Sequence, residues 1–298
     1  MTQLRKQMLE ELQRRNYSPT TIRYYLRVVE NFARYFGKGP DRLGQEHIRQ
    51  YQVYLLQERK LEANTVGLHT AALRFFFVRT LRRSYRQIDL PYPKRPKRLP
   101  TILSPDEVAR MINCANNLLD YAMLMTLYAT GVRRAELCRL KVEDIDSERM
   151  IVHIRQGKGN RDRDVPLTPK LLQTLREYWR WMKPKTYLFP GMIHNWRADK
   201  PLTPKCIWNA VQDAAKRAGI KKRVSPHTFR HSWATHLLEN GTDVRTIQML
   251  MGHADLRATS IYLHLSRRHL QAVTNPVEAM PVSPLDSVKR SRRRKQQL

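Results

Sequence analysis

Residues 89–103 have the sequence DLPYPKRPKRLPTIL, and this stretch divides the chain into two parts. Its four prolines forbid a helix, and its four cations favour an extended basic tether. A chain of 298 residues is long enough for two domains, each with its own core. We therefore expect a first domain at residues 1–90, a linker at residues 91–103, a second domain at residues 104–275 and a basic, disordered tail at residues 276–298.

The part before the tether has a helical pattern. Ser18 and Pro19 form a typical helix start, and Gly37 forms a typical helix end. Between them, apolar side chains recur at intervals of three and four, which indicates one buried face. The same spacing recurs in residues 4–12, 48–55 and 66–81. We expect a small domain of about four helices, in which the aromatic side chains form core and do not stack on bases.

The part after the tether mixes helices with a hairpin. Ser104 and Glu107 form a capping box, and the apolar run at residues 118–130 predicts a buried helix that ends at Gly131. Two β-rich runs flank Gly157-Lys158-Gly159-Asn160, which predicts a hairpin with a lysine at its tip. Further helix starts follow at Thr168-Pro169, Thr203-Pro204 and Ser225-Pro226. The expected fold class is mainly α, with a small β-sheet in the second domain.

The charge balance points to a polyanionic partner. The chain has 55 Lys and Arg against 26 Asp and Glu, a formal net charge of +29. These cations are spread along the chain, so nucleic acid fits better than a membrane surface, although net charge alone fits a ribosomal protein equally well. The start of the chain lacks the apolar core of a secretory signal, and no apolar stretch is long enough to span a bilayer. We expect a cytoplasmic, soluble protein.

Metal and disulfide chemistry find little support in the sequence. Cys114, Cys138 and Cys206 are odd in number and widely spaced, so we expect reduced core residues. His227 and His231 have the spacing of a zinc site on a helix, but the glutamate of an HExxH motif is missing. We expect no metal, no cofactor and no small-molecule substrate.

Three motifs carry the chemistry of the second domain. They are TGVRRAEL at residues 130–137, HTFRH at residues 227–231, and Gly252-His253 followed nine residues later by Tyr262, on an expected short helix at residues 258–265. Each is weak alone, since an isolated Tyr262 is more often a packed aromatic. Together with the hairpin Lys158, in this order, they resemble the phage integrase family of tyrosine recombinases, and the resemblance covers both domains.

The resemblance implies a helical, DNA-clamping first domain and a mixed α/β catalytic second domain. It implies a site-specific recombinase, active in DNA integration, excision or resolution, that cleaves and rejoins DNA through a 3′-phosphotyrosine at Tyr262. Lys158 would be the general acid for the leaving 5′ oxygen, and His227 would assist proton transfer at Tyr262. The catalytic residues so implied are Arg133, Lys158, His227, Arg230, His253 and Tyr262.

The residue types also fit the chemistry without the family. A phosphodiester gains negative charge toward its transition state, and the planar guanidinium groups of Arg133 and Arg230 match phosphate oxygens in pairs. Cationic surroundings would favour the phenolate of Tyr262, whose ordinary pKa is about 10. Glu136 is either an orienting partner of one of these arginines or a plain surface carboxylate.

Two other functions fit parts of the pattern. A type IB topoisomerase shares the tyrosine and arginine chemistry, and a DNA-binding protein without catalysis shares the charge. Within the recombinases, the size resembles both Xer proteins and mobile-element integrases, and we favour the latter. Departures from the family pattern, at Val132, Arg134-Ala135, Met251 and Ala258, remove no catalytic side chain. The expected partner is double-stranded DNA with specific recombination sites, bound by a homotetramer.

Overall fold

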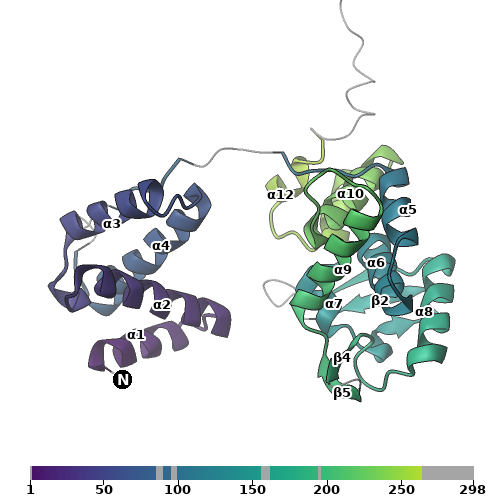
Figure 1. Ribbon diagram of the computed structural model, residues 1–298, viewed down its shortest axis with the longest axis horizontal. Coiled ribbons are helices and arrows are strands. Elements are labelled where there is room, and N and C mark those ends of the chain that lie inside the picture. Colours follow the sequence, from purple (N-terminus) through teal and green to yellow (C-terminus); the bar gives the residue numbers. More distant parts are fainter. Residues whose placement is uncertain (1, 85–89, 95–98, 156–161, 194–195, 264–298) are drawn as a thin grey trace, which may run out of the picture. The chain divides into compact units, whose positions relative to one another are not determined.

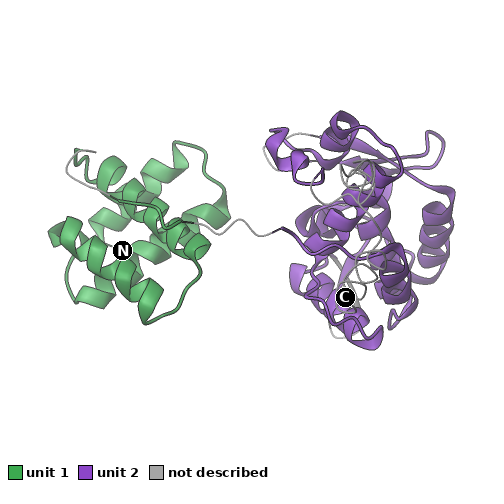
Figure 2. Cartoon of the chain, turned by 90° about the horizontal axis from the view of Figure 1, so that it is seen from above, with its two compact units in different colours: residues 1–98 green, residues 99–298 purple. Residues whose placement is uncertain are grey.

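The computed structural model describes residues 2–84, 90–94, 99–155, 162–193 and 196–263. The chain forms two compact units, Met1–Arg98 and Leu99–Leu298 (Figure 2). The predicted fold class, mainly α with a small β-sheet in the second part of the chain, is confirmed. None of the helices in the described ranges is long and apolar enough to cross a membrane.

The amino-terminal unit is helical throughout its described elements. Its elements are α1 (Gln3–Gln13), α2 (Pro19–Phe36), η1 (Pro40–Arg42), α3 (Gln45–Gln57), α4 (Ala63–Phe75) and the π-helical turn η2 (Phe76–Thr80) (Figure 1). The local signals for α2 work as expected, because the Ser18 hydroxyl accepts a hydrogen bond from the backbone N–H of Thr21. Gly37 ends this helix in the left-handed conformation, at φ 62°.

Aromatic side chains form much of the core of this unit. Phe32 from α2 packs edge to face on Tyr51 from α3 and on Phe77 from η2, and all three are buried. Tyr35 is an exception, since 42% of it is exposed. Because α2 meets α4 and η2 meets α1, the apolar stripes predicted from the sequence face one another.

In its described residues, the carboxy-terminal unit combines helices with two small antiparallel sheets. Its helices are α5 (Pro105–Asn113), α6 (Leu118–Thr130), α7 (Arg134–Arg139), η4 (Val142–Asp144), α8 (Pro169–Met182), α9 (Pro204–Arg217), α10 (Pro226–Glu239), α11 (Val244–Met251) and α12 (Arg257–Ser260). Its strands are β1 (Ile145–Asp146), β2 (Ile151–Ile154), β3 (Arg163–Pro166), β4 (Pro190–Ile193) and β5 (Trp196–Pro201).

The first sheet carries the predicted hairpin. Strands pair in the order β1-β2-β3, and Ile154 of β2 lies opposite Arg163 of β3. The tip of this hairpin, residues 156–161, lies outside the described residues. The β4–β5 hairpin was not predicted, because its strands are interrupted by Pro190, Gly191 and Pro201, which are typical of loops.

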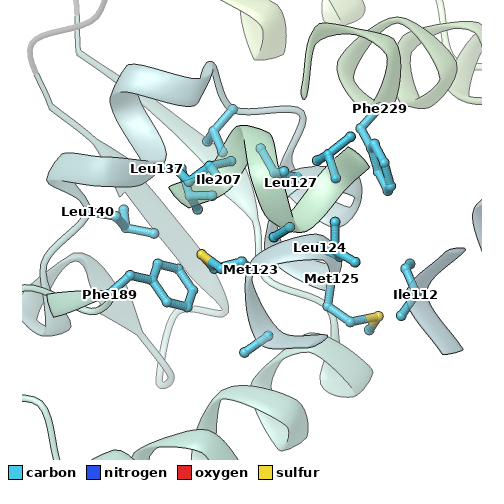
Figure 3. Packing of buried hydrophobic residues seen from close by; sticks show 14 of the residues in the cluster. Ile112, Met123, Leu124, Met125, Leu127, Leu137, Leu140, Phe189, Ile207 and Phe229 are labelled. Atoms are coloured by element: carbon cyan, nitrogen blue, oxygen red, sulfur yellow. The ribbon is translucent and has the colours of Figure 1, made fainter. Parts of the chain in front are cut away.

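Helix α6 lies at the centre of the carboxy-terminal unit. It contacts α8, α9 and α10, and its buried side chains Met123, Leu124 and Leu127 pack with apolar residues from the surrounding elements (Figure 3). This helix is apolar nearly all round, as expected for a helix enclosed on all sides. Its fixed position matters because the segment that follows it begins the candidate active site.

Two local expectations were wrong. The predicted helix at residues 258–265 is shorter in the described residues: α12 ends at Ser260, and Tyr262 lies in the turn that follows. Tyr262 is buried in an apolar cluster with Trp233 and Met251, so tertiary packing sets the path of the chain here and not a continuing helix. Of the cysteines expected in the core, Cys138 is buried, whereas Cys114 is half-buried and Cys206 is exposed at the start of α9.

Candidate active site

The turn after α6 places the first candidate arginine. Gly131 ends α6 at φ 57°, a conformation that glycine adopts without steric cost. A Cβ atom at this position would lie 2.1 Å from a ring carbon of Trp233, so the close approach of α10 also requires glycine. The chain then turns so that Arg133 becomes the N-cap residue of α7.

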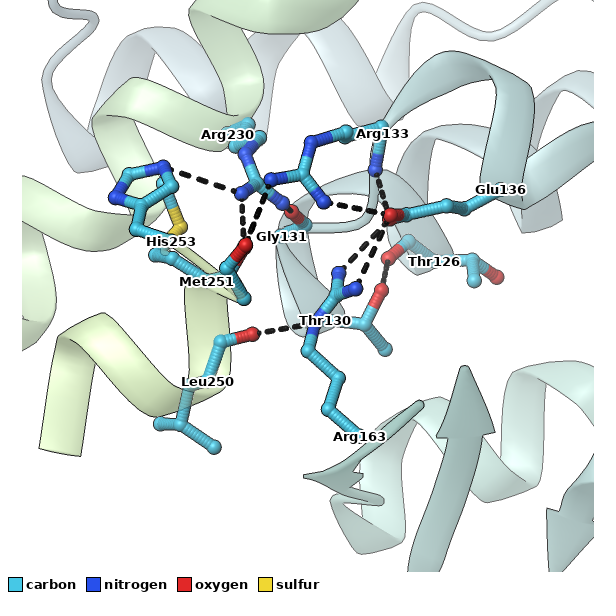
Figure 4. A network of polar contacts seen from close by, with 11 residues as sticks. Thr126, Thr130, Gly131, Arg133, Glu136, Arg163, Arg230, Leu250, Met251 and His253 are labelled. Atoms are coloured by element: carbon cyan, nitrogen blue, oxygen red, sulfur yellow. Dashed lines mark hydrogen bonds and ion pairs between the residues drawn. The ribbon is translucent and has the colours of Figure 1, made fainter. Parts of the chain in front are cut away.

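Arg133 is held by a carboxylate one helical turn away. Its Nη1 donates to Oε1 of Glu136 at 2.7 Å, and its backbone N–H donates to Oε2 at 2.7 Å. Its Nη2 donates to the carbonyl oxygen of Met251 at 3.3 Å (Figure 4) and to that of Gly252 at 3.1 Å. Glu136 is only 4% exposed, which excludes the reading of it as a plain surface carboxylate.

A further arginine, Arg163, also binds Glu136. Its Nη1 and Nη2 donate to the two carboxylate oxygens at 3.1 and 2.8 Å, and its Nε donates to the carbonyl of Leu250 at 2.7 Å (Figure 4). Burial alone would raise the pKa of Glu136, but Arg163 and Arg133 together lower it to about 2. The carboxylate is therefore ionised at every pH at which the protein would act.

Helix α10 supplies the second candidate arginine. The Ser225 hydroxyl caps the helix and fixes its start, which puts Arg230 in the interior, 3% exposed. Its two terminal nitrogens donate to the carbonyl oxygens of Gly131 and Met251. Burial first, and then the charges of neighbouring arginines, lower the pKa of Arg230 to about 9, so it still carries its charge at neutral pH.

His253 follows directly after the left-handed Gly252 that ends α11. Nη2 of Arg230 donates to its Nε2 at 3.4 Å. Because a guanidinium group has only donors, Nε2 must accept, and the ring proton lies on Nδ1, which donates to the Thr259 hydroxyl at 2.9 Å. Burial and the nearby arginines lower the pKa of His253 to about 4, so the ring is neutral.

Tyr262 lies on the other side of His253. The two rings are nearly parallel, with centroids 6.5 Å apart, and a hydrogen bond of 3.0 Å joins the Tyr262 hydroxyl to Nδ1 of His231. Burial raises the pKa of Tyr262 to about 12, although Arg230 and Arg133 act in the opposite direction. The expected preference for phenolate is therefore not met in this arrangement, because the ring is only 1% exposed.

The two histidines of α10 have different surroundings. His227 is exposed, while His231 is half-buried and contacts Tyr262. Their ring centroids lie 6.5 Å apart, and both line a cavity of about 860 Å³ with Trp208, Lys216 and Arg223. Burial and the neighbouring charges lower the pKa of both rings, to about 4 for His231.

The sixth candidate, Lys158, lies in residues 156–161, outside the described residues. The other candidates that the sequence predicted come from distant segments. Arg133, Arg230, His253 and Tyr262 lie close together, linked by direct contacts or through the carbonyl of Met251.

Sequence reasoning missed Arg163 and gave His231 no role at Tyr262. The sequence did contain a signal for Arg163: it lies two positions before Val165 in β3, so the two side chains share one face of the strand, and Val165 is 1% exposed. An arginine at an inward-facing strand position needs a buried carboxylate partner. His231 was weighed only as a metal ligand, and the described residues contain no group of three or more His, Cys, Asp or Glu side chains placed to hold a metal ion.

Family models match both parts of the chain. A model described as the phage integrase family matches residues 101–269, and one described as the phage integrase N-terminal SAM-like domain matches residues 4–87. Together these matches span most of the 298 residues.

Individual relatives show the same similarity. The integrase/recombinase y4qK of Sinorhizobium fredii is 49% identical over 282 residues, covering 94% of this chain and 90% of the relative. The tyrosine recombinase XerA of Pyrococcus furiosus is 35% identical over 277 residues, covering 90% and 93%. A solved lambda integrase tetramer bound to a Holliday junction shares the fold, with a TM-score of 0.69 at 18% identity over 86% of this chain and 75% of that chain.

Proposed function

The chain belongs to the phage integrase family of tyrosine recombinases, and we propose that it cleaves DNA by attack of Tyr262 on the scissile phosphate. Family membership makes it a site-specific DNA recombinase that breaks and rejoins strands. The alternative of type IB relaxation is not favoured. The residues proposed to surround the phosphate are Arg133, Lys158, His227, Arg230 and His253.

One observation carries the residue assignment. Two arginines, a histidine and a tyrosine from three separate segments meet around the carboxy-terminal end of α11. Such a group of fixed cations beside a phenol suits an in-line displacement at a phosphodiester, where negative charge increases toward the transition state. The buried contacts use only part of the donor capacity of each guanidinium, so N–H groups of Arg133 and Arg230 are left for phosphate oxygens.

The reaction proceeds by exchange of one phosphate ester for another. The oxygen of Tyr262 forms a bond to phosphorus, and the bond from phosphorus to the 5′ oxygen breaks. The phenolic proton passes from Tyr262 to the neutral imidazole of His227, a role taken from the resemblance. Lys158 donates a proton to the departing 5′ oxygen, a role taken from the resemblance. The 3′-phosphotyrosine keeps the ester energy, so a 5′ hydroxyl of another strand reverses the step without ATP.

The observed position of Tyr262 requires a movement before this attack. Its side chain is only 1% exposed, so a phosphodiester cannot reach the hydroxyl in this arrangement. His227 is exposed on the neighbouring helix, at the cavity that it shares with His231. We propose that His227 lies beside the bound phosphate, at the edge of the site that borders this cavity.

Assembly on DNA is proposed by analogy with a fold relative. Lambda integrase has been solved as a tetramer bound to a Holliday junction, and this chain would likewise bind two specific duplex sites as a homotetramer. Residues 1–90 would act as a DNA clamp, and the net charge of +29 fits an extended contact with phosphates. Mass photometry of the protein with synapsed site DNA tests this proposal, and a complex that stays dimeric would contradict it.

Covalent capture tests the assignment of Tyr262. The full-length protein is mixed in EDTA with a supercoiled plasmid that carries the DNA flanking its own gene, and with nicked suicide duplexes from the same DNA. We expect an SDS-resistant adduct at one discrete site with wild type, and none with Tyr262→Phe. Tyr128→Phe is the matched control, because Tyr128 also shares a hydrogen bond with a histidine of α10, His236, at 2.8 Å.

Other results would point elsewhere. An adduct that persists in Tyr262→Phe would contradict the nucleophile. Adducts at many unrelated positions, together with relaxation of the plasmid, would contradict site-specific cleavage. Tight binding without an adduct on any flanking fragment would contradict the proposed cleavage and favour a binding protein.

A further inference from the structure

Arg163 lies in the active-site network but outside the set of catalytic candidates. It begins β3, and its side chain is 7% exposed. Its guanidinium donates to both carboxylate oxygens of Glu136, while its Nε donates to the carbonyl of Leu250 (Figure 4). Because Nε, Nη1 and Nη2 of Arg163 all donate to buried protein groups, its guanidinium is poorly placed to contact DNA, and its effect must reach the reaction through other residues.

The carboxy-terminal end of α11 binds all three arginines. Its last carbonyl groups have no partner within the helix and carry the negative end of the helix dipole. Arg163 binds the carbonyl of Leu250, Arg133 and Arg230 bind that of Met251, and Arg133 also binds that of Gly252. Successive carbonyls at this helix end therefore anchor the arginines that would hold the phosphate.

Packing at Gly252 ties Arg163 to His253 as well. A Cβ atom at Gly252 would lie 3.1 Å from Cδ and 3.2 Å from Nη1 of Arg163. The arginine side chain thus lies directly against the backbone of the residue before His253. A shift of Arg163 would move the backbone that carries His253.

Arg163 also changes the net charge of the buried group around Glu136. Glu136 paired with Arg133 alone would be neutral overall, and the carboxylate would offset the charge that a phosphate needs. With Arg163 present, the buried group of Glu136, Arg133 and Arg163 has a net charge of +1. Arg163 occupies both oxygens of Glu136, so it shares the carboxylate that otherwise belongs to Arg133.

We propose that Arg163 is a positioning residue for DNA cleavage, which shares Glu136 with Arg133 and holds the end of α11 so that Arg133 and His253 are aligned for the scissile phosphate. This proposal rests on the proposed function. Strand β3, which follows the hairpin tip that carries Lys158, would thereby take part in the reaction through Arg163.

Single-turnover cleavage of the nicked suicide duplex tests the proposal. Arg163→Gln removes the charge and Arg163→Lys keeps it without the fork, each in the full-length protein. The matched control is Arg155→Gln, directly after β2 in the same hairpin, where a side chain that is 53% exposed pairs with Asp144. Duplex affinity and melting temperature are measured separately for each variant.

The expected loss lies in the rate of cleavage. At saturating duplex, Arg163→Gln should cleave about 10- to 100-fold more slowly, a smaller loss than the roughly 10²- to 10³-fold from removing a direct donor. Its Kd should stay within about threefold of wild type, because surface phosphate contacts set affinity. Arg163→Lys should recover part of the rate, and Arg155→Gln should stay within about twofold of wild type.

The pH profile separates positioning from simple destabilisation. Among the residues that the structure describes, Arg133 and Arg163 face Glu136 through hydrogen bonds, and His227 and Arg230 interact with it by charge at longer range. Glu136 also borders a cavity of about 270 Å³ lined by Arg139, Lys141, Asp144 and Arg155. Without Arg163 the carboxylate is easier to protonate, so the deficit of Arg163→Gln should be larger at pH 5.5 than at pH 8, whereas wild type lacks this acidic limb.

Each contrary outcome overturns the proposal. A lower melting temperature with an unchanged rate per folded molecule means that Arg163 has only a structural role. A weaker Kd with an unchanged rate at saturation means that it binds DNA. If Arg163→Gln fails to fold, a wild-type rate in Arg163→Lys also means a structural role only. Failure of the proposed function itself is seen separately, as absence of an adduct with wild type.

Discussion

The two halves of the candidate active site are built differently. On one side, Arg133 and Arg163 share the buried carboxylate of Glu136, and all three arginines donate to carbonyls at the end of α11. On the other side, Tyr262 follows a four-residue helix, and a hydrogen bond to the neutral His231 holds its hydroxyl. The first half joins four elements of the fold, and the second lies near the end of the described chain.

This difference separates what is preorganised from what must move. The arginine side chains are held in the cationic half by backbone and carboxylate groups that stay in place, although Arg230, which is 3% exposed, must also become accessible when DNA binds. The proposed nucleophile, Tyr262, is buried and protonated, so in this account its approach to the phosphate is the step left for DNA binding to trigger. Apart from Tyr262→Phe, which removes the proposed nucleophile, we predict large losses of rate from changes in the first half and small gains of rate from changes that free Tyr262 in the second.

The largest effect is expected for Arg230→Lys. A lysine keeps one charge but cannot donate to the Gly131 and Met251 carbonyls and still present a fork to phosphate. We expect about a 10²- to 10³-fold slower single-turnover cleavage, with duplex affinity nearly unchanged. Arg257→Lys, at a side chain that is 94% exposed on α12, is the control. A loss below about threefold would show that the cationic half is not what drives the reaction.

A smaller effect of opposite sign is expected for His231→Leu. The substitution removes the hydrogen bond that holds Tyr262 in its buried position, worth about 0.5 to 1.5 kcal/mol. Cleavage should become roughly 2- to 10-fold faster in the single-turnover assay, because less free energy is needed to expose the nucleophile. His236→Leu is matched to it, since His236 holds Tyr128 in the same way on the same helix. A tenfold slower reaction would instead make His231 the acceptor of the phenolic proton.

The smallest effect is expected from pH. The pKa values of His231 and His253 are lowered to about 4, and that of His227 is also lowered. A lowered pKa means that the neutral form persists until the pH falls through that value, so His231 and His253 stay neutral between pH 5.5 and 7.5, and His227 is mostly neutral at pH 6.5 and above. Wild-type cleavage should show no acidic limb with a midpoint at pH 6.5 or higher. A fall in rate with a midpoint near 6.5 would mean that a histidine with an ordinary pKa controls the step.

The sequence predicted the cationic half better than the nucleophile's half. Gly131, the Ser225 cap and the motif order were enough to bring Arg133 and Arg230 together, since local signals fix the ends of α6 and α10. Glu136 was predicted as a possible orienting partner, and its burial decides between the two readings.

The missing parts depend on contacts between distant segments. Arg163 meets Glu136 across 27 positions and Leu250 across 87, and no periodicity within one segment reports such a pair. The state of Tyr262 was also hidden, because its pKa depends on a balance between burial and nearby arginines that only packing sets. The hairpin tip at residues 156–161 lies outside the described residues, so the prediction for Lys158 stays a prediction.

Mapping the residue that carries the DNA tests the central claim most directly. The SDS-resistant adduct formed on the suicide duplex is digested with nuclease and protease, and the nucleotide-bearing peptide is sequenced by tandem mass spectrometry. We predict a phosphonucleotide on the oxygen of Tyr262, joined through the 3′-phosphate. A nucleotide on any other side chain, or a 5′-phosphate linkage at Tyr262, would contradict the assignment of this tyrosine and of the arginine network built beside it.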